Sequence, residues 1–497
     1  MTWIKGDRFY ILVMLLLILI IAIRAPLDTD MWWHLRAGEE TWNNRSVYME
    51  DTLSYTRAGE AWINHSWLAQ VFMIGLYKLG EFKALSLWVG VGAVLCMYFV
   101  YLQMEGQTLL KVGLVLFASF VCSVVWSPRP QMFSLIMFAL CGLLLYRYQK
   151  NKSSVLIWLL PVFILWSNMH GGYVLGIILI GTQVGGEILN KILGEESEDS
   201  FSWKEIGLLA IWGVVGFGSA AINPNGINMW KIPFQTIGVE TLQNLIKEWA
   251  SPDFHQPVQQ LLLILLFGTF AAVGLSKKRL DGKELVSFIV FGILALIARR
   301  NFAPFAIVAA PVLARHLSII TTSWTSRMAG RWEFIKTLQK YQHQSEQNIN
   351  KSLQFFVNLS AVLLLVAGAG YKWISVSSTD FIERTEEKIF PVGAVSYLKE
   401  KKPPGRLFNA YNWGGYLTWR LPEYQVFVDG RTDLFGDEII LEWLKIVNAD
   451  NMWQKTLEDW NINTILVEKN QPIIKVLEAN GWREVYIDNL STIYQKE

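Results

Sequence analysis

The chain has 497 residues, of which 52% are hydrophobic and only 17% charged, and its formal net charge is +2. This composition excludes a disordered chain and an ordinary soluble enzyme, and it indicates a membrane protein with many spans. The nearly balanced charge gives no reason to expect a nucleic-acid partner. Because Cys96, Cys122 and Cys141 lie inside apolar runs, we predict no disulfide or zinc framework.

The first apolar run, residues 9–23, is interpreted as a retained membrane span. It follows two basic residues as a signal peptide would, but no small-residue cleavage pattern comes with it. Ten further runs qualify or nearly qualify as spans: residues 84–102, 109–126, 132–148, 155–167, 173–193, 206–222, 258–275, 285–298, 302–317 and 353–371. We therefore expect a polytopic α-helical protein with about eleven transmembrane helices.

The distribution of Lys and Arg predicts the orientation. With the N-terminus in the cytoplasm, four of the five cytoplasmic loops are basic, residues 147–152 and 277–283 among them. This topology requires that residues 66–79, which are apolar but short, form an interfacial or re-entrant helix. Residues 321–351 then form a polar cytoplasmic connector. We expect the protein in a bacterial cytoplasmic (inner) membrane, with its C-terminus outside the cytoplasm.

An acidic corner follows the first span, at the start of the first outer loop, residues 25–82. It contains Asp28, Asp30, His34 and Arg36. Charged side chains at the edge of a hydrocarbon segment are costly, which favours a functional role. A carboxylate here could take a proton from an acceptor, and the aspartate pair could share a divalent cation. The structural alternative is that an aspartate caps the next helix.

Other polar residues are expected on the same face of the membrane. They include His65, Arg129, Asn168, His170, Asn223, Asn225, Glu248, Asp253, His255, Arg299, Arg300 and Asn301. Arg299 and Arg300 contradict the positive-inside trend, so we interpret them as phosphate ligands. Arg129 is a third candidate, with snorkelling to the interface as its alternative. Trp32 and Trp33 are expected to be interface anchors.

The last part of the chain, residues 376–497, has the charge density of a soluble domain, whereas residues 1–375 form the predicted membrane domain. Helices are predicted over residues 392–401, 438–447, 452–460 and 472–479, and strands over 406–409, 425–428, 464–467, 484–487 and 492–494. This pattern indicates a small α/β domain. Residues 409–416 and 428–433 lie at strand ends, where ligands often bind, although turn and ion-pair roles for Asp429 and Arg431 are equally open.

This order of features resembles the GT-C superfamily, the integral-membrane glycosyltransferases that use polyprenyl-phosphate-linked sugars. The acidic motif in a long first outer loop, the many spans and the C-terminal extracytoplasmic domain carry the resemblance. So does the interfacial helix over residues 65–80, with its ending Tyr77-Lys78-Leu79-Gly80. One departure is Gln131, which stands where several relatives have an acidic residue after an arginine.

The resemblance implies an inverting glycosyltransferase of cell-envelope glycan biosynthesis. Such an enzyme moves a sugar from the polyprenyl-phosphate carrier to an extracytoplasmic glycan, lipid or protein, among membrane lipids. It implies Asp28 or Asp30 as the catalytic base, with or without a divalent cation there. The expected substrate-binding residues are His34, Arg36, His65, Arg129, His170, Arg299 and Arg300.

Two other classes of protein are weighed beside the enzyme. A transporter or flippase of lipid or polysaccharide predicts charges near the middle of the membrane, whereas the charged residues here cluster at span ends. A non-catalytic membrane scaffold would use the C-terminal domain to bind a partner.

Overall fold

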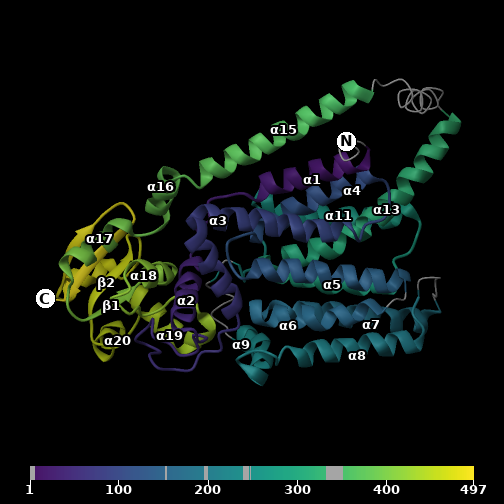
Figure 1. Cartoon of the computed structure of the whole chain (residues 1–497). Helices are drawn as coiled ribbons and strands as arrows, with labels where there is room; N and C mark the ends of the chain where they lie inside the picture. Colours follow the sequence, from purple (N-terminus) through teal and green to yellow (C-terminus); the bar gives the residue numbers. More distant parts are fainter. Residues whose placement is uncertain are drawn as a thin grey trace.

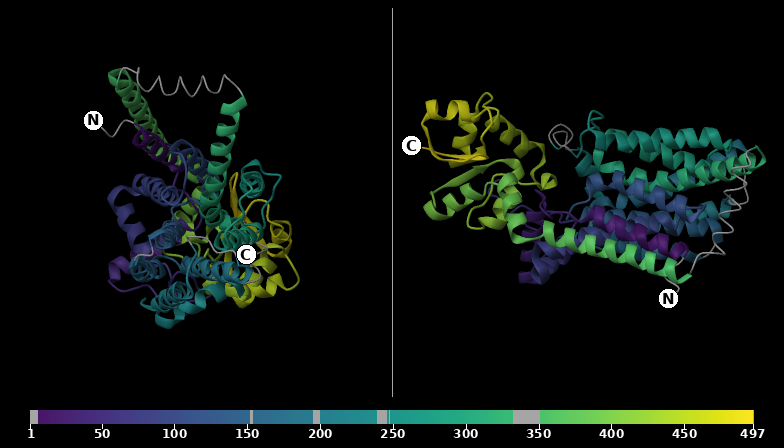
Figure 2. Two further views of the ribbon diagram at one scale, coloured as in Figure 1. Left: turned by 90° about the vertical axis from the view of Figure 1, so that its right-hand side faces the viewer. Right: turned by 90° about the horizontal axis from the view of Figure 1, so that it is seen from above.

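The computed structural model describes residues 6–151, 154–194, 200–238, 246, 248–331 and 351–496 (Figure 1). The long helices lie side by side in one bundle, and the C-terminal segment sits at one end of it (Figure 1 and Figure 2). The N-terminus lies at the opposite end. The acidic corner is located where the bundle meets the C-terminal segment, because α2 (Met31–Asn44), which follows that corner, packs against the C-terminal helix α18 (Gly414–Arg420).

Each predicted span coincides with a helix. These helices are α1 (Asp7–Ala22), α3 (Trp67–Tyr101), α4 (Thr108–Cys122), α5 (Gln131–Asn151), α6 (Leu159–Met169), α7 (Val174–Leu193), α8 (Trp203–Ser219), α11 (Pro257–Ser276), α12 (Gly282–Ile297), α13 (Phe302–Arg331) and α15 (Lys351–Val376). Within the described ranges, 7 helices are long and apolar enough to cross a membrane, so the chain is an integral membrane protein. The count of eleven spans stays a prediction. Of the predicted connector, residues 332–350 lie outside the described residues.

The helix predicted over residues 66–79 is the first half of α3, which bends before it continues into the bundle. Gly80 and Glu81 leave the helical conformation there, and the φ of Glu81 is 48°. Helix α2 packs against this first half so closely that a Cβ at Gly38 would lie 2.3 Å from the carbonyl oxygen of Gln70. Glycine thus lets the two backbones touch, and this contact holds the start of α2 in place.

The C-terminal segment contains a four-stranded sheet in the order β1-β2-β4-β3. Strand β1 is parallel to β2, and the other neighbours are antiparallel. The strands are β1 (Arg406–Asn409), β2 (Ile462–Glu468), β3 (Trp482–Ile487) and β4 (Ser491–Lys496). The other helices here are α16 (Thr379–Ile389), α17 (Val392–Lys401), α19 (Thr432–Val447), α20 (Trp453–Asp459) and α21 (Ile474–Leu477). Four of the five predicted strands are therefore confirmed.

The predicted strand over residues 425–428 is wrong, because this stretch pairs with the first loop and not with the sheet. Val426 forms an isolated parallel bridge with Ser54, and the N–H of Phe427 donates to the Asn409 side chain at 2.8 Å. Helices α16 and α18 were not predicted. Helix α18 begins with two glycines, and their low helix propensity is the reason that the sequence did not indicate a helix there.

Residues 45–66, the middle of the first outer loop and called the first loop below, lie against the C-terminal segment. The N–H of Val426 donates to the carbonyl of Leu53 at 3.0 Å. Arg431 donates to Asp51 at 2.7 Å, and both side chains are fully buried. The division of the chain at residue 376 into a membrane domain and a soluble domain stays a prediction. In space, the first loop packs with the C-terminal segment.

The interpretation of Trp32 and Trp33 as interface anchors is wrong. Trp32 is fully buried, and its ring packs edge-on against Phe390 and Tyr416, with centroids 5.6 and 5.2 Å away. Trp33 is buried beside Trp62. Both rings project from α2 and pack against other parts of the chain. Burying their large apolar surfaces there stabilises the position of α2.

Candidate active site

The acidic corner lies between the end of α1 and the start of α2. Asp30 occupies the N-cap position of α2, but its side chain makes no capping hydrogen bond. Instead, Oδ1 of Asp28 accepts the backbone N–H of Asp30 at 2.9 Å. The capping alternative therefore does not account for the Asp30 carboxylate, which is free to face the groups around it.

Arg129 brings three carboxylates together. It lies just before α5, and its Nη1 donates to Oδ2 of Asp30 at 2.6 Å. Its Nε is 3.5 Å from Oδ2 of Asp28 and donates to Oγ of Ser127 at 3.0 Å. Its Nη2 donates to Oε1 of Glu248. Arg129 is 9% exposed, so these bonds form in a place that water reaches poorly.

The protonation of Asp30 and Glu248 is shifted in opposite directions. Burial raises the pKa of Asp30 to about 6, although the Arg129 guanidinium lowers it in part. Burial also acts to raise the pKa of Glu248, but Arg129 and then Arg300 outweigh it and hold that pKa below its ordinary value. Asp30 therefore has the pKa of a group that can accept a proton near neutral pH.

The three predicted histidines lie around this cluster. Nδ1 of His34 is 3.3 Å from the Gln70 amide, and burial, with Arg129, lowers the pKa of His34. Nδ1 of His170 accepts the backbone N–H of Gly172 at 3.0 Å, so the proton of this neutral ring is on Nε2. The rings of His65 and His170 are 5.8 Å apart.

Arg299 and Arg300 form the short 3-10 helix η6 (Arg299–Asn301) between α12 and α13. The backbone N–H of Arg300 donates to the carbonyl of Glu248 at 3.1 Å. The guanidinium of Arg300 stacks on the Trp249 ring, 4.1 Å from its centroid. A small cavity of about 50 Å³ is lined by Arg300, His170 and Gln131, among others. Among the described residues, the Arg300 guanidinium makes no hydrogen bond or ion pair.

The C-terminal segment covers the acidic corner from the other side. A Cβ at Gly430 would lie 2.1 Å from Oδ1 of Asp30. Asp433, three residues on, accepts the indole N–H of Trp62 at 3.0 Å and lies 3.8 Å from Nδ1 of His65. Residues 430–433 thus lie beside the acidic corner and form one wall of the candidate site.

The Gly430→Ala substitution is expected to overpack the corner by about 1–3 kcal/mol and to lower activity at this site by about 5- to 150-fold. The new methyl group must displace the Asp30 carboxylate, while the backbone of residue 430 tolerates alanine. The measurement is activity in purified membranes, with folding followed by thermal unfolding. Gly268→Ala is the matched control, because a Cβ there meets open space. Full activity of Gly430→Ala would contradict the close approach.

The structure does not bring Arg36 to the site. Its guanidinium pairs with Glu39 at 2.8 Å and with Glu40 at 2.7 Å, both on α2 itself. A hydrophilic helix face explains these pairs. Arg36 as a substrate ligand therefore stays an unsupported prediction, whereas Asp28, Asp30 and Arg129 make direct contact.

The residues of the corner do not fit a divalent cation as they are arranged. The Arg129 guanidinium already lies against one oxygen of each of the three carboxylates that a metal would use. A divalent ion about 4 Å from a guanidinium is repelled by about 8 kcal/mol at an effective dielectric constant of about 20. Within the described part of the chain, no group of three or more His, Cys, Asp or Glu is arranged to hold a metal ion.

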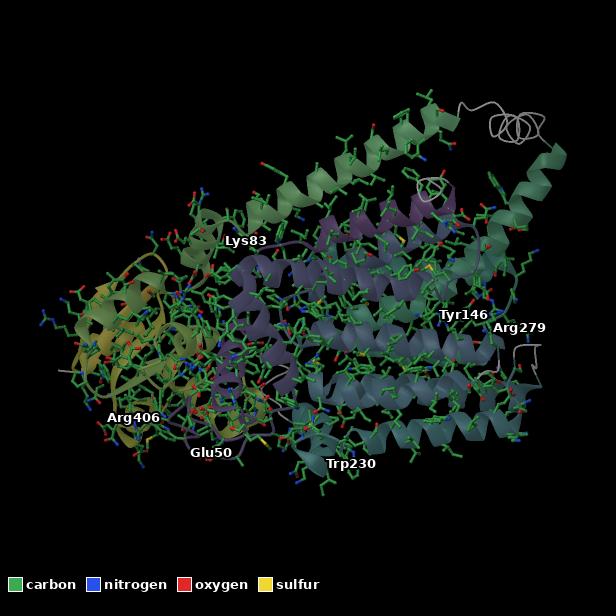
Figure 3. All side chains as sticks on the ribbon, in the orientation of Figure 1. Glu50, Lys83, Tyr146, Trp230, Arg279 and Arg406 are labelled. Carbon is green, nitrogen blue, oxygen red and sulfur yellow. The ribbon has the colours of Figure 1, made fainter. Side chains whose placement is uncertain are left out.

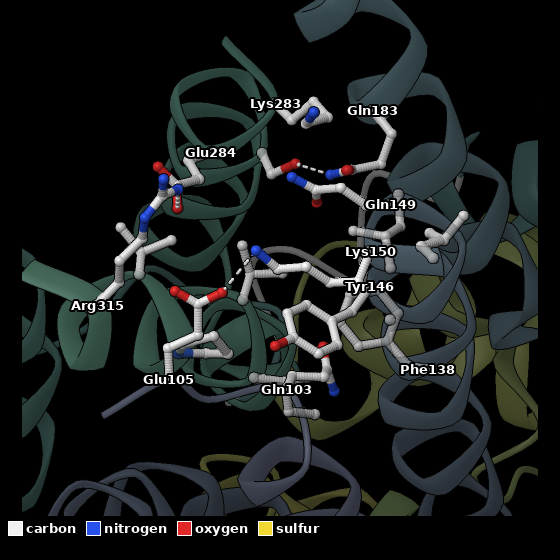
Figure 4. A pocket seen from close by; sticks show the side chains of 18 residues that line it. Gln103, Glu105, Phe138, Tyr146, Gln149, Lys150, Gln183, Lys283, Glu284 and Arg315 are labelled. Atoms are coloured by element: carbon white, nitrogen blue, oxygen red, sulfur yellow. Dashed lines mark hydrogen bonds and ion pairs between the residues drawn. The ribbon is translucent and has the colours of Figure 1, made fainter. Parts of the chain in front are cut away.

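A second cavity, of about 130 Å³, lies elsewhere (Figure 4). Tyr146 and Lys150 line it at the end of α5 opposite Arg129, and Figure 3 places Tyr146 far from Arg406 in the C-terminal segment. Its charged residues are paired: Lys150 with Glu105 at 2.9 Å, and Arg315 with Glu284 at 2.7 Å. This cavity is thus separate from the acidic corner, and none of the predicted site residues lines it.

Sequence reasoning missed the part that Glu248 takes in the site. It placed Glu248 on the same face as Asp28, Asp30 and Arg129, which the structure brings together, but it favoured a structural loop. The signal present was a carboxylate next to Trp249 in a connection on that face. The approach of Gly430 to Asp30 left no signal beyond its strand-end position.

No protein-family model matches the chain, and no curated protein matches its sequence. Solved structures do match its fold. The oligosaccharyltransferase AglB from Archaeoglobus fulgidus, in complex with an inhibitory peptide and a dolichol-phosphate, has a TM-score of 0.58 at 11% identity and covers 92% of this chain and 69% of its own. The apo form of the same archaeal enzyme has a TM-score of 0.55 at 13% identity, and the match covers 94% of this chain and 70% of the archaeal chain. A complex with Zn and sulfate has a TM-score of 0.53 at 15% identity and covers 92% and 68%.

Proposed function

We propose that this chain, which has the fold of the GT-C glycosyltransferases, moves a sugar from a polyprenyl-phosphate carrier to an acceptor outside the cytoplasm. The main supporting observation is that a candidate base and a candidate anion-binding site lie close together at one end of the bundle. Asp30, with its raised pKa, lies on the Arg129 cluster. Arg300 lies nearby, beside a cavity, with its guanidinium unbonded among the described residues. A base and an anion site are the two requirements of such a transfer.

In the proposed reaction, the Asp30 carboxylate takes the proton of an acceptor hydroxyl or amine. The acceptor oxygen or nitrogen attacks the anomeric carbon on the face opposite the lipid phosphate. The bond from that carbon to the phosphate oxygen breaks, and the electron pair leaves with the polyprenyl phosphate. The guanidinium groups of Arg300 and Arg299 neutralise the charge that develops there, and the anomeric configuration inverts.

Two of the three histidines, His170 and His65, are proposed to bind substrate. Nε2–H of His170, in the cavity beside Arg300, is a donor for a phosphate or sugar oxygen. His65, next to it, faces the Asp433 wall. His34, bonded to Gln70, supports the start of α2 more directly than it can reach a ligand.

The carrier, acceptor and location are part of the proposal. The archaeal enzyme is in complex with a dolichol-phosphate and an inhibitory peptide, which supports a lipid phosphate and an acceptor as the two partners. The acceptor is a glycan, a lipid or a protein. We place the N-terminus in the cytoplasm and the C-terminal segment outside, in a bacterial inner membrane, on the basis of the basic loops.

The pH dependence of transfer follows from the raised pKa of Asp30. Only the ionised carboxylate accepts a proton, so activity should rise with pH, reach half its maximum near pH 6 and fall about tenfold per pH unit below that. The measurement is the pH profile of kcat/KM in detergent or nanodiscs. A midpoint near pH 4, the ordinary value for a carboxyl group, would contradict this environment for the base.

The function is tested by deleting the gene and comparing lipid-linked glycans and envelope glycans with those of the parent strain. We expect one lipid-linked sugar to accumulate and one glycan product to disappear, and wild-type protein to restore both. Unchanged glycans would exclude the proposal and favour a scaffold.

A further inference from the structure

Arg129 occupies the centre of an acidic cluster built from separate parts of the chain. Asp28 and Asp30 precede α2, Glu248 comes from the connection before α11, and Arg129 comes from the turn before α5. Every nitrogen of the guanidinium is used: Nη1 on Asp30, Nη2 on Glu248, and Nε on Ser127 and near Asp28. Arg129 is 9% exposed, and the Glu248 side chain, 40% exposed, is the part of the cluster that reaches solvent.

Positive charge already lies against the three carboxylates. Arg129 contacts all three, and Arg300 and Arg299 act electrostatically on Glu248. A metal ion placed among these carboxylates would therefore lie beside fixed positive charge. A guanidinium also cannot lose its proton in a protein, so it cannot give up its charge to admit a metal.

We propose that the Arg129 guanidinium is the resident cation of this site, in the place between Asp28 and Asp30 where a divalent metal ion would otherwise bind. The site then holds its base without a metal, and Arg129 is the positioning residue for the Asp30 carboxylate. The electrostatic part of this inference concerns the cluster alone. Only the statement that the sugar transfer needs no divalent metal rests on the proposed function.

The test is a titration of the purified full-length protein with Mn²⁺, followed by the electron paramagnetic resonance of the free ion, with no substrate present. The wild type is expected to bind no stoichiometric Mn²⁺ at the cluster up to about 1 mM. Arg129→Met frees the three carboxylates and is expected to gain one site that is tighter by at least about tenfold. That gain should vanish in the double variant with Asp30→Asn.

Arg420→Met is the matched control, since it also removes a paired arginine but leaves only Glu386 behind. Arg129→Lys keeps the positive charge and is expected to bind no Mn²⁺, which covers the case in which Arg129→Met does not fold. One equivalent of Mn²⁺ on the wild type, lost in Asp30→Asn, would overturn the proposal. A folded Arg129→Met that binds no more Mn²⁺ than its double variant would overturn it as well.

The two proposals fail separately. A protein that binds no Mn²⁺ and transfers no sugar loses only the proposed function. A protein that transfers sugar, binds Mn²⁺ at the cluster and loses its activity in a chelator loses only the inference drawn from Arg129.

Discussion

The Asp30→Asn variant is expected to lose sugar transfer by about 10²–10⁴-fold in kcat, the range that a positioned general base contributes. Asparagine keeps the size of the side chain and an oxygen that can accept the bond from Arg129, now 2.6 Å long. It cannot take a proton from the acceptor at neutral pH. The measurement is the release of polyprenyl phosphate from lipid-linked sugars in membranes that contain the variant, with thermal unfolding as the check on folding.

Asp28→Asn is the matched control, because it makes the same change two residues away. Asp28 uses Oδ1 to accept the backbone N–H of Asp30 and lies 3.5 Å from Nε of Arg129, so its position is that of a support. We expect a loss on the order of tenfold from a looser corner. A larger loss in Asp28→Asn than in Asp30→Asn would make Asp28 the base. Full transfer in both variants would exclude the mechanism.

The second large effect concerns stability. Arg431→Met is expected to destabilise the C-terminal segment and first loop by about 3–5 kcal/mol, the cost of leaving buried charges without their partner. Arg431 bonds to Asp429 through Nε and Nη2 and to Asp51 through Nη1, at 2.7 to 3.1 Å. All three side chains are fully buried. Removing the guanidinium leaves two carboxylates that water cannot reach.

The measurement is the apparent melting temperature of the full chain in detergent, which we expect to fall by on the order of 10 °C. Arg406→Met is the control, because that arginine lies over the Tyr55 ring on an exposed surface. The triple variant that also carries Asp51→Asn and Asp429→Asn should recover part of the loss, since no unpaired charge remains. An unchanged melting temperature in Arg431→Met would show that the ion pairs of Arg431 with Asp51 and Asp429 do not hold the first loop in place.

The sequence predicted the helices of the bundle and the strands of the sheet well. Hydropathy and alternation are local properties, and each span or strand shows them within one short window. The stretch at residues 425–428 failed because its strand-like pattern is satisfied by Ser54 in the first loop, a partner that a window around it does not contain. Helix α18 failed because tertiary packing overrides the low propensity of its glycines.

The sequence predicted which residues form the candidate site and that they share one face of the membrane. It did not predict which side chains contact each other. Hydropathy placed Asp28, Asp30 and Arg129 at span ends, and the positive-inside rule put them on one face. Neither could show that the guanidinium binds the carboxylates, or that Arg36 is occupied by its neighbours on α2. Side-chain partners depend on where helix ends meet in three dimensions.

The sequence by itself determined that this is a membrane protein of many helices, with an acidic corner after its first helix and a strand-containing end, because composition and periodicity specify those features locally. Only the tertiary structure decided that Arg129 reaches Asp30 across 99 positions and Glu248 across 119, and that Gly430 closes the corner. Those contacts join distant segments, and the packing of the whole bundle against the C-terminal segment sets their geometry.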